Sequence, residues 1–182
     1  MRATPLALAG AMLIEPAVYR DARGAFYEAW NERVFATGGI EAHFVQENVS
    51  VSSRHVLRGL HYQVAQAQGK LIRVLAGAVF DVIVDLRRSS AGFGRSLSVQ
   101  LDASEPRSLW VPAGFAHGFL ALTDDTHVQY KVTDFWAPRA ERTLAWDDPA
   151  LGIQWPLPAG IEPILSDKDR SGLLLAQAET FP

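Results

Sequence analysis

The stretch Val56–Gln63 places Arg58 and His61 among apolar residues, and Lys70 follows a few positions later. Imidazole takes up or releases a proton near neutral pH, and an ammonium beside it can stabilise negative charge on a substrate oxygen. A lone histidine in a strand more often lies on an exposed edge strand, so a chemical role for His61 is indicated only by the nearby Arg58 and Lys70. Strict two-residue alternation puts Arg58 and His61 on opposite faces of a strand. We expect a bulge at Gly59 that re-aims one of them.

A second stretch, Trp110–Phe119, contains a Pro-x-Gly turn that leads into His117. It resembles the second sequence motif of the cupins, whose metal-binding members combine this histidine with a His-x-His pair and a glutamate. Here the position of the pair reads His-Tyr-Gln, beginning at His61, and no carboxylate lies between His61 and Lys70. We therefore expect a cupin-like barrel with no metal and no other cofactor.

The stretch Val128–Val132 places Tyr130 on the same face as two valines, which predicts that its phenol points inward. Such a tyrosine is commonly a core residue whose hydroxyl binds a backbone carbonyl. Enclosed with His61 and Lys70, a neutral phenol can instead donate a proton to a carbanion. Both interpretations are compatible with the sequence.

These side chains need a scaffold, and the sequence predicts one made of short strands. Apolar and β-branched residues alternate in runs separated by turn signals, with strands expected at Leu71–Leu75, Val79–Leu86, Leu97–Leu101, Phe119–Leu122 and Val128–Val132. Many short antiparallel strands require a closed or two-layered sheet, so we expect an all-β sandwich, jelly roll or small barrel that spans 1–182 as a single domain. A short helix is expected at Asn31–Ala36, and the last third, rich in Pro and Trp, is expected to form ordered loops over the barrel.

The composition limits the classes of partner. Of 182 residues, 48% are hydrophobic and 20% are charged, and the net charge is −3. A hydrophobic core is therefore available, whereas nucleic acid and anionic membranes are not expected as partners. The absence of cysteine excludes disulfides and fits a cytoplasmic protein. The apolar run Pro5–Ala9 loosely resembles a secretion signal, but it is short and Glu15-Pro16 follows, so we expect an N-terminal strand there.

An ordered series of motifs runs nearly from end to end, at Asp21–Glu28, Phe44–Asn48, Val56–Gln63, Gln68–Leu71, Phe80–Leu86, Trp110–Phe119, Tyr130–Lys131, Trp146–Pro156 and Leu165–Asp169. In these motifs the chain resembles the dTDP-4-dehydrorhamnose 3,5-epimerase family. One motif would be weak, but the whole series in this order is specific. The chain departs from the usual family pattern at Glu47-Asn48-Val49, at Trp146-Asp147-Asp148 and within Thr123–His127.

The resemblance implies a cupin-like jelly-roll homodimer that inverts C3 and C5 of dTDP-4-keto-6-deoxy-D-glucose, giving dTDP-4-keto-L-rhamnose on the route to dTDP-L-rhamnose. By match to the family motifs, His61 is the base that removes both protons and Asp169 orients it. The same match makes Tyr130 the donor at C5 and places Lys70 near the C4 oxygen. Contacts to the sugar and nucleotide fall on Arg23, Phe26, Glu28, Gln46, Asn48, Arg58, His117, Trp136, Glu141 and Lys168. Among them, Trp136 matches the aromatic side chain that stacks on the thymine ring.

The chemistry of these side chains agrees with the implied roles. A C–H bond next to a ketone becomes acidic when the enolate oxygen meets positive charge, which Lys70 can provide in a water-poor barrel. A carboxylate such as Asp169 on the other nitrogen of His61 fixes its tautomer and stabilises the imidazolium. A base that returns its own proton regenerates the starting centre, so net inversion requires a second donor such as Tyr130 on the opposite face.

Three alternatives remain open from the sequence. A relative that inverts only C3 or only C5, in a deoxysugar or antibiotic pathway, would take up deuterium from heavy water at that carbon alone. A metal-dependent cupin oxygenase or isomerase would contain stoichiometric iron, zinc or manganese. A sugar-nucleotide binding module would have no turnover to lose when His61 is replaced by alanine.

Overall fold

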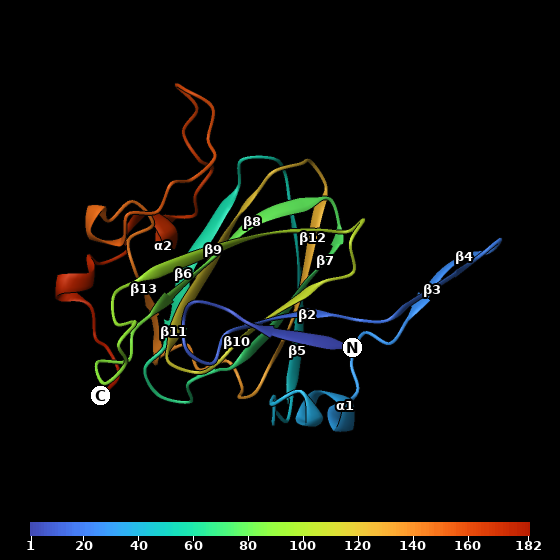
Figure 1. The fold of residues 1–182 in the computed structure, drawn as a ribbon. Helices are drawn as coiled ribbons and strands as arrows, with labels where there is room; N and C mark the ends of the chain where they lie inside the picture. The colour runs from blue at the N-terminus through green and yellow to red at the C-terminus, as the bar shows by residue number, and fades with distance from the viewer.

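The computed structural model describes residues 1–182 and consists mainly of antiparallel strands in two facing sheets (Figure 1). The larger sheet has the strand order β1 (Arg2–Pro5), β2 (Met12–Glu15), β10 (Ser108–Val111), β7 (Lys70–Ala76), β12 (Thr126–Val132) and β5 (Gln46–Ser52). The smaller sheet has the order β13 (Glu141–Thr143), β6 (Leu57–Gln63), β11 (Phe115–Ala121), β8 (Ala78–Asp85) and β9 (Ser96–Asp102). From β5 onward the chain passes back and forth between the sheets, which makes the fold a jelly-roll barrel and confirms the predicted all-β class.

The space between the sheets is apolar on one side and polar on the other. Where β7 and β10 face β8 and β9, buried side chains such as Ile72, Leu109, Ile83 and Leu101 form the main core. Burying an aliphatic side chain of this size contributes about 1.5–3 kcal/mol. Where β5 and β12 face β6 and β13, polar and charged side chains point inward instead. The apolar side stabilises the barrel and leaves the polar side open to a ligand.

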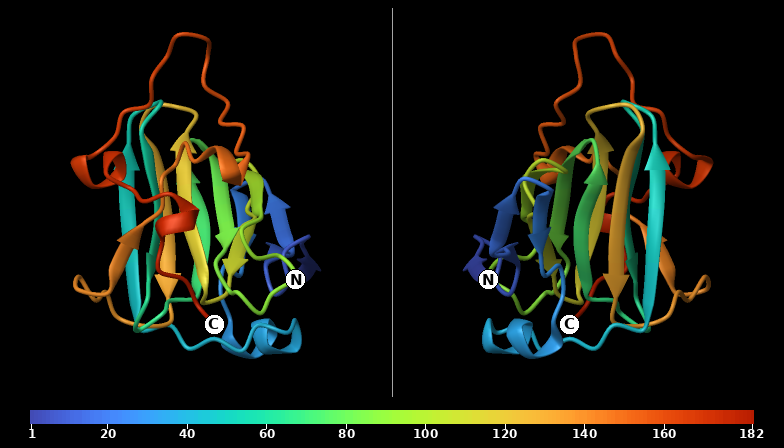
Figure 2. Two further views of the ribbon diagram at one scale, coloured as in Figure 1. Left: turned by 90° about the vertical axis from the view of Figure 1, so that its left-hand side faces the viewer. Right: turned by 90° about the vertical axis from the view of Figure 1, so that its right-hand side faces the viewer.

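The outer face of the five-stranded sheet is covered by the C-terminal segment. Leu60 of β6 and Val84 of β8 pack there against Leu144. The segment contains a 3-10 turn (Pro149–Leu151), the short helix α2 (Asp167–Arg170) and a second 3-10 turn (Leu175–Gln177). Between the first turn and α2 it forms a long loop that extends beyond the barrel (Figure 2). Apart from strands β12 and β13, the last third therefore consists of ordered loops and short helical turns, as its composition predicted.

Helix α1 (Glu32–Thr37) packs on the six-stranded sheet, with Phe35 buried beside Ile14 and Leu71. It begins after Asn31, whose side-chain oxygen accepts hydrogen bonds from the backbone N–H groups of the first turn, and it ends at Gly38. The helix predicted at Asn31–Ala36 is confirmed with a shift of one residue. No helix in the structure combines the length and the apolar character needed to cross a bilayer.

The strands predicted from alternation are confirmed at β7, β8, β9, β11 and β12. The N-terminal run Pro5–Ala9 differs from the prediction, because β1 ends at Pro5 and the following residues form a turn closed by a 2.9 Å hydrogen bond from the Leu6 N–H to the Ala11 carbonyl. Leu8 and Ala11 are buried in the main core. The run is apolar because the turn packs into the barrel, and the strand expected there was wrong beyond Pro5.

Strands β3 (Val18–Asp21) and β4 (Gly24–Tyr27) form a separate two-stranded hairpin. It projects from the barrel on the side away from α2 and β13 (Figure 1). Two of its three large aromatic side chains are exposed, with Tyr19 at 68% and Phe26 at 73%. The hairpin therefore contributes little to the core of its own chain.

Candidate active site

A cavity of about 460 Å³ opens on the polar side of the barrel, between β5 and β12 of one sheet and β6, β11 and β13 of the other. Cavities of this size commonly bind small molecules. The residues expected to act in catalysis or to bind the substrate that line it are His61, Lys70, Tyr130, Asp169, Gln46, Asn48, Arg58, His117, Trp136, Glu141 and Lys168. One cavity thus brings together all four expected catalytic residues and seven of the ten expected substrate contacts.

Strand β6 brings Arg58 and His61 to the same cavity despite their odd spacing. The pairing of β6 with β11 shifts register between His117 and Phe119, opposite Arg58 and His61. Gly59 has a φ of +126°, and a Cβ atom there would lie 2.5 Å from the Cα of Gly118. Only glycine fits this conformation and this close approach. The irregularity expected at Gly59 is therefore present and lets both side chains face the cavity.

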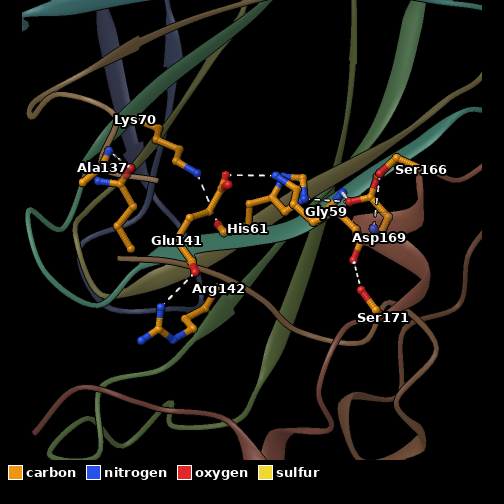
Figure 3. A network of polar contacts seen from close by, with 11 residues as sticks. Gly59, His61, Lys70, Ala137, Glu141, Arg142, Ser166, Asp169 and Ser171 are labelled. Atoms are coloured by element: carbon orange, nitrogen blue, oxygen red, sulfur yellow. Dashed lines mark hydrogen bonds and ion pairs between the residues drawn. The ribbon is translucent and has the colours of Figure 1, made fainter. Parts of the chain in front are cut away.

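His61 is paired with a carboxylate from outside the barrel (Figure 3). Its Nε2 lies 2.6 Å from Oδ1 of Asp169, which α2 carries. Oδ2 of Asp169 accepts a 2.6 Å hydrogen bond from the Ser166 hydroxyl, and Oδ1 accepts a 3.2 Å bond from the Gly59 N–H. A carboxylate held by three donors stays ionised and accepts the Nε2 proton of the imidazole. Nδ1 of His61 then keeps its lone pair, as a base requires.

The pKa values of the pair follow from burial and from these bonds. Burial lowers the pKa of His61 and outweighs Asp169, which acts to raise it, while Lys168 and Lys70 lower it further. Burial by itself would raise the pKa of Asp169, but the hydrogen bonds from His61 and Ser166 prevail and lower it to about 2. At neutral pH the pair is therefore a neutral imidazole beside an ionised carboxylate.

Lys70 of β7 is buried, and its Nζ donates a 3.3 Å hydrogen bond to the backbone carbonyl of His61 (Figure 3). Burial lowers its pKa to about 8, with Asp81 and Glu141 acting in the opposite direction and Lys168 in the same one. The ammonium is still mostly protonated at neutral pH, and water screens it poorly in this position. Negative charge that develops on a substrate carbonyl beside it would be stabilised.

Tyr130 lies on β12 in the six-stranded sheet, whereas His61 lies on β6 in the five-stranded sheet. Both side chains line the same cavity. Burial raises the pKa of the Tyr130 phenol, with Arg58 acting in the opposite direction, so the hydroxyl stays protonated at neutral pH. The cavity presents a base from one wall and an acid from the other. Such an arrangement can remove a proton from one face of a carbon and deliver one to the opposite face.

A second histidine–aspartate pair lies beside the first. His117 on β11 is the register partner of His61, and its Nε2 lies 3.0 and 2.9 Å from the two carboxylate oxygens of Asp81 on β8. Asp81 is fully buried and was not among the residues expected to form the site. The sequence did contain a signal for Asp81, because a carboxylate within the apolar run Val79–Val84 is costly to bury unless it is paired.

Metal-binding cupins gather three or four imidazole and carboxylate ligands around one point. Here His61 and His117 are bound to separate aspartates. No group of three or more histidine, aspartate or glutamate side chains is arranged to hold a metal ion. The donor set of a metal cupin is therefore not assembled in this cavity.

The dTDP-4-dehydrorhamnose 3,5-epimerase family model matches residues 5–177. The dTDP-4-dehydrorhamnose 3,5-epimerase of Pseudomonas aeruginosa is 52% identical over 183 residues, which covers the whole of both chains. The chain belongs to the dTDP-4-dehydrorhamnose 3,5-epimerase family. A second relative of the same name, from Methanothermobacter thermautotrophicus, is 49% identical and covers 90% of this chain and 89% of its own.

Solved structures of related epimerases share the fold of this family member. The dTDP-6-deoxy-D-glucose-3,5-epimerase of Legionella pneumophila, in complex with dTDP-4-keto-L-rhamnose, matches with a TM-score of 0.93 at 42% identity and covers 98% of this chain and 94% of its own. A 3'-monoepimerase from Streptomyces bikiniensis, in complex with dTDP-quinovose, matches with a TM-score of 0.88 at 38% identity and covers 95% and 87%. The same barrel is therefore used by enzymes named for two carbons and for one.

Three of the substrate contacts expected from the epimerase family lie outside the cavity: Arg23, Phe26 and Glu28. Arg23 lies in the turn of the β3–β4 hairpin and forms a 2.6 Å ion pair with Asp21. Glu28 comes directly after β4 and accepts a 3.0 Å hydrogen bond from Asn31. The hairpin projects on the side away from α2 and β13 (Figure 1), and none of the three side chains lines the cavity of its own chain.

One departure from the family pattern, at Glu47-Asn48-Val49, changes side chains that do not line the cavity. Glu47 and Val49 are exposed on β5, and Glu47 pairs there with Lys131 and Gln129.

Residues that line the cavity without having been expected to do so are Ser50, Tyr62, Gln63, Gln68, Phe119 and Ser166. Gln63 had a signal, since two-residue alternation from His61 puts it on the same face.

Proposed function

We propose that this chain inverts C3 and C5 of dTDP-4-keto-6-deoxy-D-glucose to give dTDP-4-keto-L-rhamnose, a step of dTDP-L-rhamnose biosynthesis. The proposal rests above all on one arrangement, in which His61 and Tyr130 enter one cavity from opposite sheets. The Legionella pneumophila relative, whose complex holds dTDP-4-keto-L-rhamnose, supports the choice of ligand. The base, the acid and the cation that the chemistry needs are all side chains of this chain.

In the first half of an inversion, Nδ1 of His61 accepts the proton of the C–H bond next to the ketone, and the electron pair of that bond forms the enolate. The ammonium of Lys70 stabilises the enolate oxygen, and the carboxylate of Asp169 stabilises the imidazolium. At C5 the enolate carbon then takes the hydroxyl proton of Tyr130 on the opposite face, and the ketone re-forms. Water reprotonates the phenolate and removes the proton from His61, which restores the free enzyme. At C3, His61 removes the proton in the same way, and a solvent water delivers a proton to the opposite face of the enolate carbon, so that the ketone re-forms with C3 inverted.

The experiment that tests this function is turnover of dTDP-4-keto-6-deoxy-D-glucose in heavy water, followed by NMR and mass spectrometry of the sugar. We expect deuterium at both C3 and C5 and the L-configured 4-keto sugar as product. Label at neither carbon would contradict the proposal. Label confined to C3 would select a single-carbon epimerase, the alternative favoured by the 38% identity to the Streptomyces 3'-monoepimerase.

We also propose that the enzyme is a homodimer in which the β3–β4 hairpin of one copy completes the cavity of the other. The family resemblance makes Arg23, Phe26 and Glu28 substrate contacts, although they lie outside the cavity of their own chain. Phe26 is the most exposed of the large hydrophobic side chains. Val49, Val51 and Leu75 are also exposed, and exposed apolar groups of this kind favour association.

Mixing two inactive variants tests the exchange of hairpins. Arg23→Ala removes a hairpin contact and His61→Ala removes the base, so in a mixed dimer one of the two sites receives both intact groups. We expect activity to return when the variants are mixed and allowed to exchange subunits, and sedimentation to report a dimer. A monomer, or a mixture that stays inactive while its subunits exchange, would contradict the proposal.

A further inference from the structure

The segment that carries Trp136 joins β12 to β13 and belongs to neither strand. Trp136 lines the cavity and is 57% exposed, so its indole is not held by packing alone. Its neighbour Phe135 is 58% exposed. A segment with so little apolar burial needs another source of order if its aromatic ring is to be a fixed platform.

Glutamine side chains supply that order through the backbone of the segment. Gln63 Nε2 donates to the Phe135 carbonyl at 3.2 Å and to the Gln66 carbonyl at 2.8 Å, while Gln63 Oε1 accepts the N–H of Ala137 at 2.9 Å. The Gln63 side-chain amide therefore uses both of its N–H donors and its carbonyl acceptor. Two of these bonds hold the backbone on either side of Trp136. The side chain that does this is almost fully buried, with 4% of Gln63 exposed.

Two further glutamines bind the backbone of the same segment. Gln46 Oε1 accepts the N–H of Trp136 at 3.1 Å, and Gln68 Nε2 donates to the carbonyl of Asp134 at 2.9 Å. Gln46 reaches the segment from β5 and Gln63 from β6, so the segment is anchored to both sheets. Gln63 is the most heavily engaged of the three and the only one that is buried.

Gln63 also lies two residues after His61 on β6, and both side chains line the cavity. We propose that Gln63 is the positioning residue for the nucleoside end of the site: by fixing the backbone around Trp136 to the strand that carries the base, it sets the spacing between the thymine platform and the reacting carbons. This inference rests on the proposed function, because Trp136 can stack on thymine only if the substrate is a dTDP-sugar. A ring held in place before binding loses less conformational entropy when the nucleotide arrives.

The test is a double-mutant cycle on binding of dTDP, measured by calorimetry. Gln63→Met keeps the length of an unbranched side chain and removes all three hydrogen bonds, and we expect dTDP to bind about tenfold more weakly. Trp136→Ala removes the platform, and loss of one stacked base weakens binding by about 5- to 150-fold. If Gln63 acts through Trp136, the two losses are not additive, and Gln63→Met changes binding less than about twofold when Trp136 is already alanine.

Steady-state kinetics supply a readout that a general loss of stability would not move. We expect Gln63→Met to raise KM for the sugar nucleotide about tenfold while kcat changes less than about threefold, since the base and acid are intact. Gln63→Glu is the second variant: its carboxylate still accepts from Ala137 but has no proton for the Gln66 and Phe135 carbonyls, and we expect the same split. Gln100→Met, at an exposed site where the side chain makes no hydrogen bond, is the matched control and should leave KM and kcat unchanged.

The outcomes separate this inference from the function on which it rests. The role of Gln63 is supported if Gln63→Met weakens dTDP binding when Trp136 is present and has almost no further effect when Trp136 is already alanine. Unchanged binding in Gln63→Met, or losses that add fully with Trp136→Ala, overturns that role while the epimerase function stands. Wild-type protein that binds no dTDP and does not turn over the keto sugar overturns both.

Discussion

The two histidine–aspartate pairs of the cavity are neighbours on the same sheet, yet they are built in different ways. His61 has 24% of its side chain exposed toward the cavity, and its partner Asp169 comes from α2, outside the barrel. His117 has only 7% exposed, and its partner Asp81 comes from the adjacent strand and is completely buried. Asp169 keeps Ser166 and Gly59 as further donors, whereas both oxygens of Asp81 are directed at His117.

A histidine–carboxylate pair therefore does not by itself make a base. A base must reach the substrate and must afterwards release its proton to water, and the open, externally supported His61 meets both conditions. The closed pair of His117 and Asp81 instead adds a buried negative charge near Lys70 and a rigid element to the wall.

Replacing His61 by alanine should remove the chemistry and leave the fold intact. General base catalysis contributes up to about 10⁴-fold, so we expect turnover to fall by about 10³- to 10⁴-fold. Asp169 still has Ser166 and Gly59 as donors, so the melting temperature should change little. Stopped-time assays of the keto sugar and thermal melts of the same sample check both halves. A variant that retains more than a tenth of wild-type turnover would show that another group is the base.

Replacing His117 by alanine should act first on stability, in contrast to His61. Asp81 would be left buried without its partner, which costs about 3–5 kcal/mol. For a chain of this size that corresponds to a fall in melting temperature of roughly 6–20 °C. The paired change of His117→Leu with Asp81→Leu removes both polar groups and should recover much of the loss. Equal melting temperatures for His117→Ala and the wild type would contradict the structural reading of this pair.

Replacing Asp169 by asparagine keeps the shape of the open pair and removes its charge. Without a carboxylate to stabilise the imidazolium, we expect turnover to fall by about 10²- to 10³-fold. Asp169 raises the pKa of His61, so its loss should also move the acid limb of the pH profile to lower pH. A pH series of kcat/KM checks the direction, and a shift to higher pH would count against the assignment.

The last prediction concerns the pH dependence of activity, because Lys70 contacts the backbone of His61 and is influenced by Asp81. His61 must be unprotonated, so activity should fall as the pH drops through its pKa, which burial holds below the usual value of 6.5. Lys70 must be protonated, so activity should fall again as the pH rises through about 8. Asp81 and Glu141 raise the pKa of Lys70 and Lys168 lowers it, so Asp81→Asn should move the alkaline limb to lower pH. An alkaline limb that does not move would remove Asp81 from this role.

From short-range signals the sequence predicted many of the strands and the group Arg58, His61, Lys70 and Tyr130, whereas most other cavity residues were expected only from the family resemblance. The alternation in Val128–Val132 was enough to turn Tyr130 inward, and the Gly59 irregularity was expected from the odd spacing of Arg58 and His61. The role expected of Asp169 came from the family resemblance, because no local pattern tells which of several charged residues in a C-terminal turn will meet a strand 108 positions earlier.

The failures have physical reasons as well. Asp81 was missed because its partner His117 lies on a neighbouring strand, and the pairing of strands is a long-range property. Gln63 was missed because its side chain binds backbone groups of Phe135 and Ala137, in a loop whose position the sequence does not predict. Arg23, Phe26 and Glu28 were expected at the site from the family resemblance, but they lie outside the cavity because the β3–β4 hairpin projects away from the barrel (Figure 1). The turn after Pro5 was read as strand because core-filling turns and strands are equally apolar.

Inversion at C5 requires that His61 and Tyr130 act on opposite faces of that carbon, and turnover of the Tyr130→Phe variant in heavy water tests this requirement. If His61 removes the C5 proton and Tyr130 supplies the proton to the other face, this variant should still exchange the C5 hydrogen for deuterium while the C5 configuration is retained. In His61→Ala, neither exchange nor inversion should occur. Full inversion at C5 by Tyr130→Phe, or exchange that persists in His61→Ala, would contradict the account.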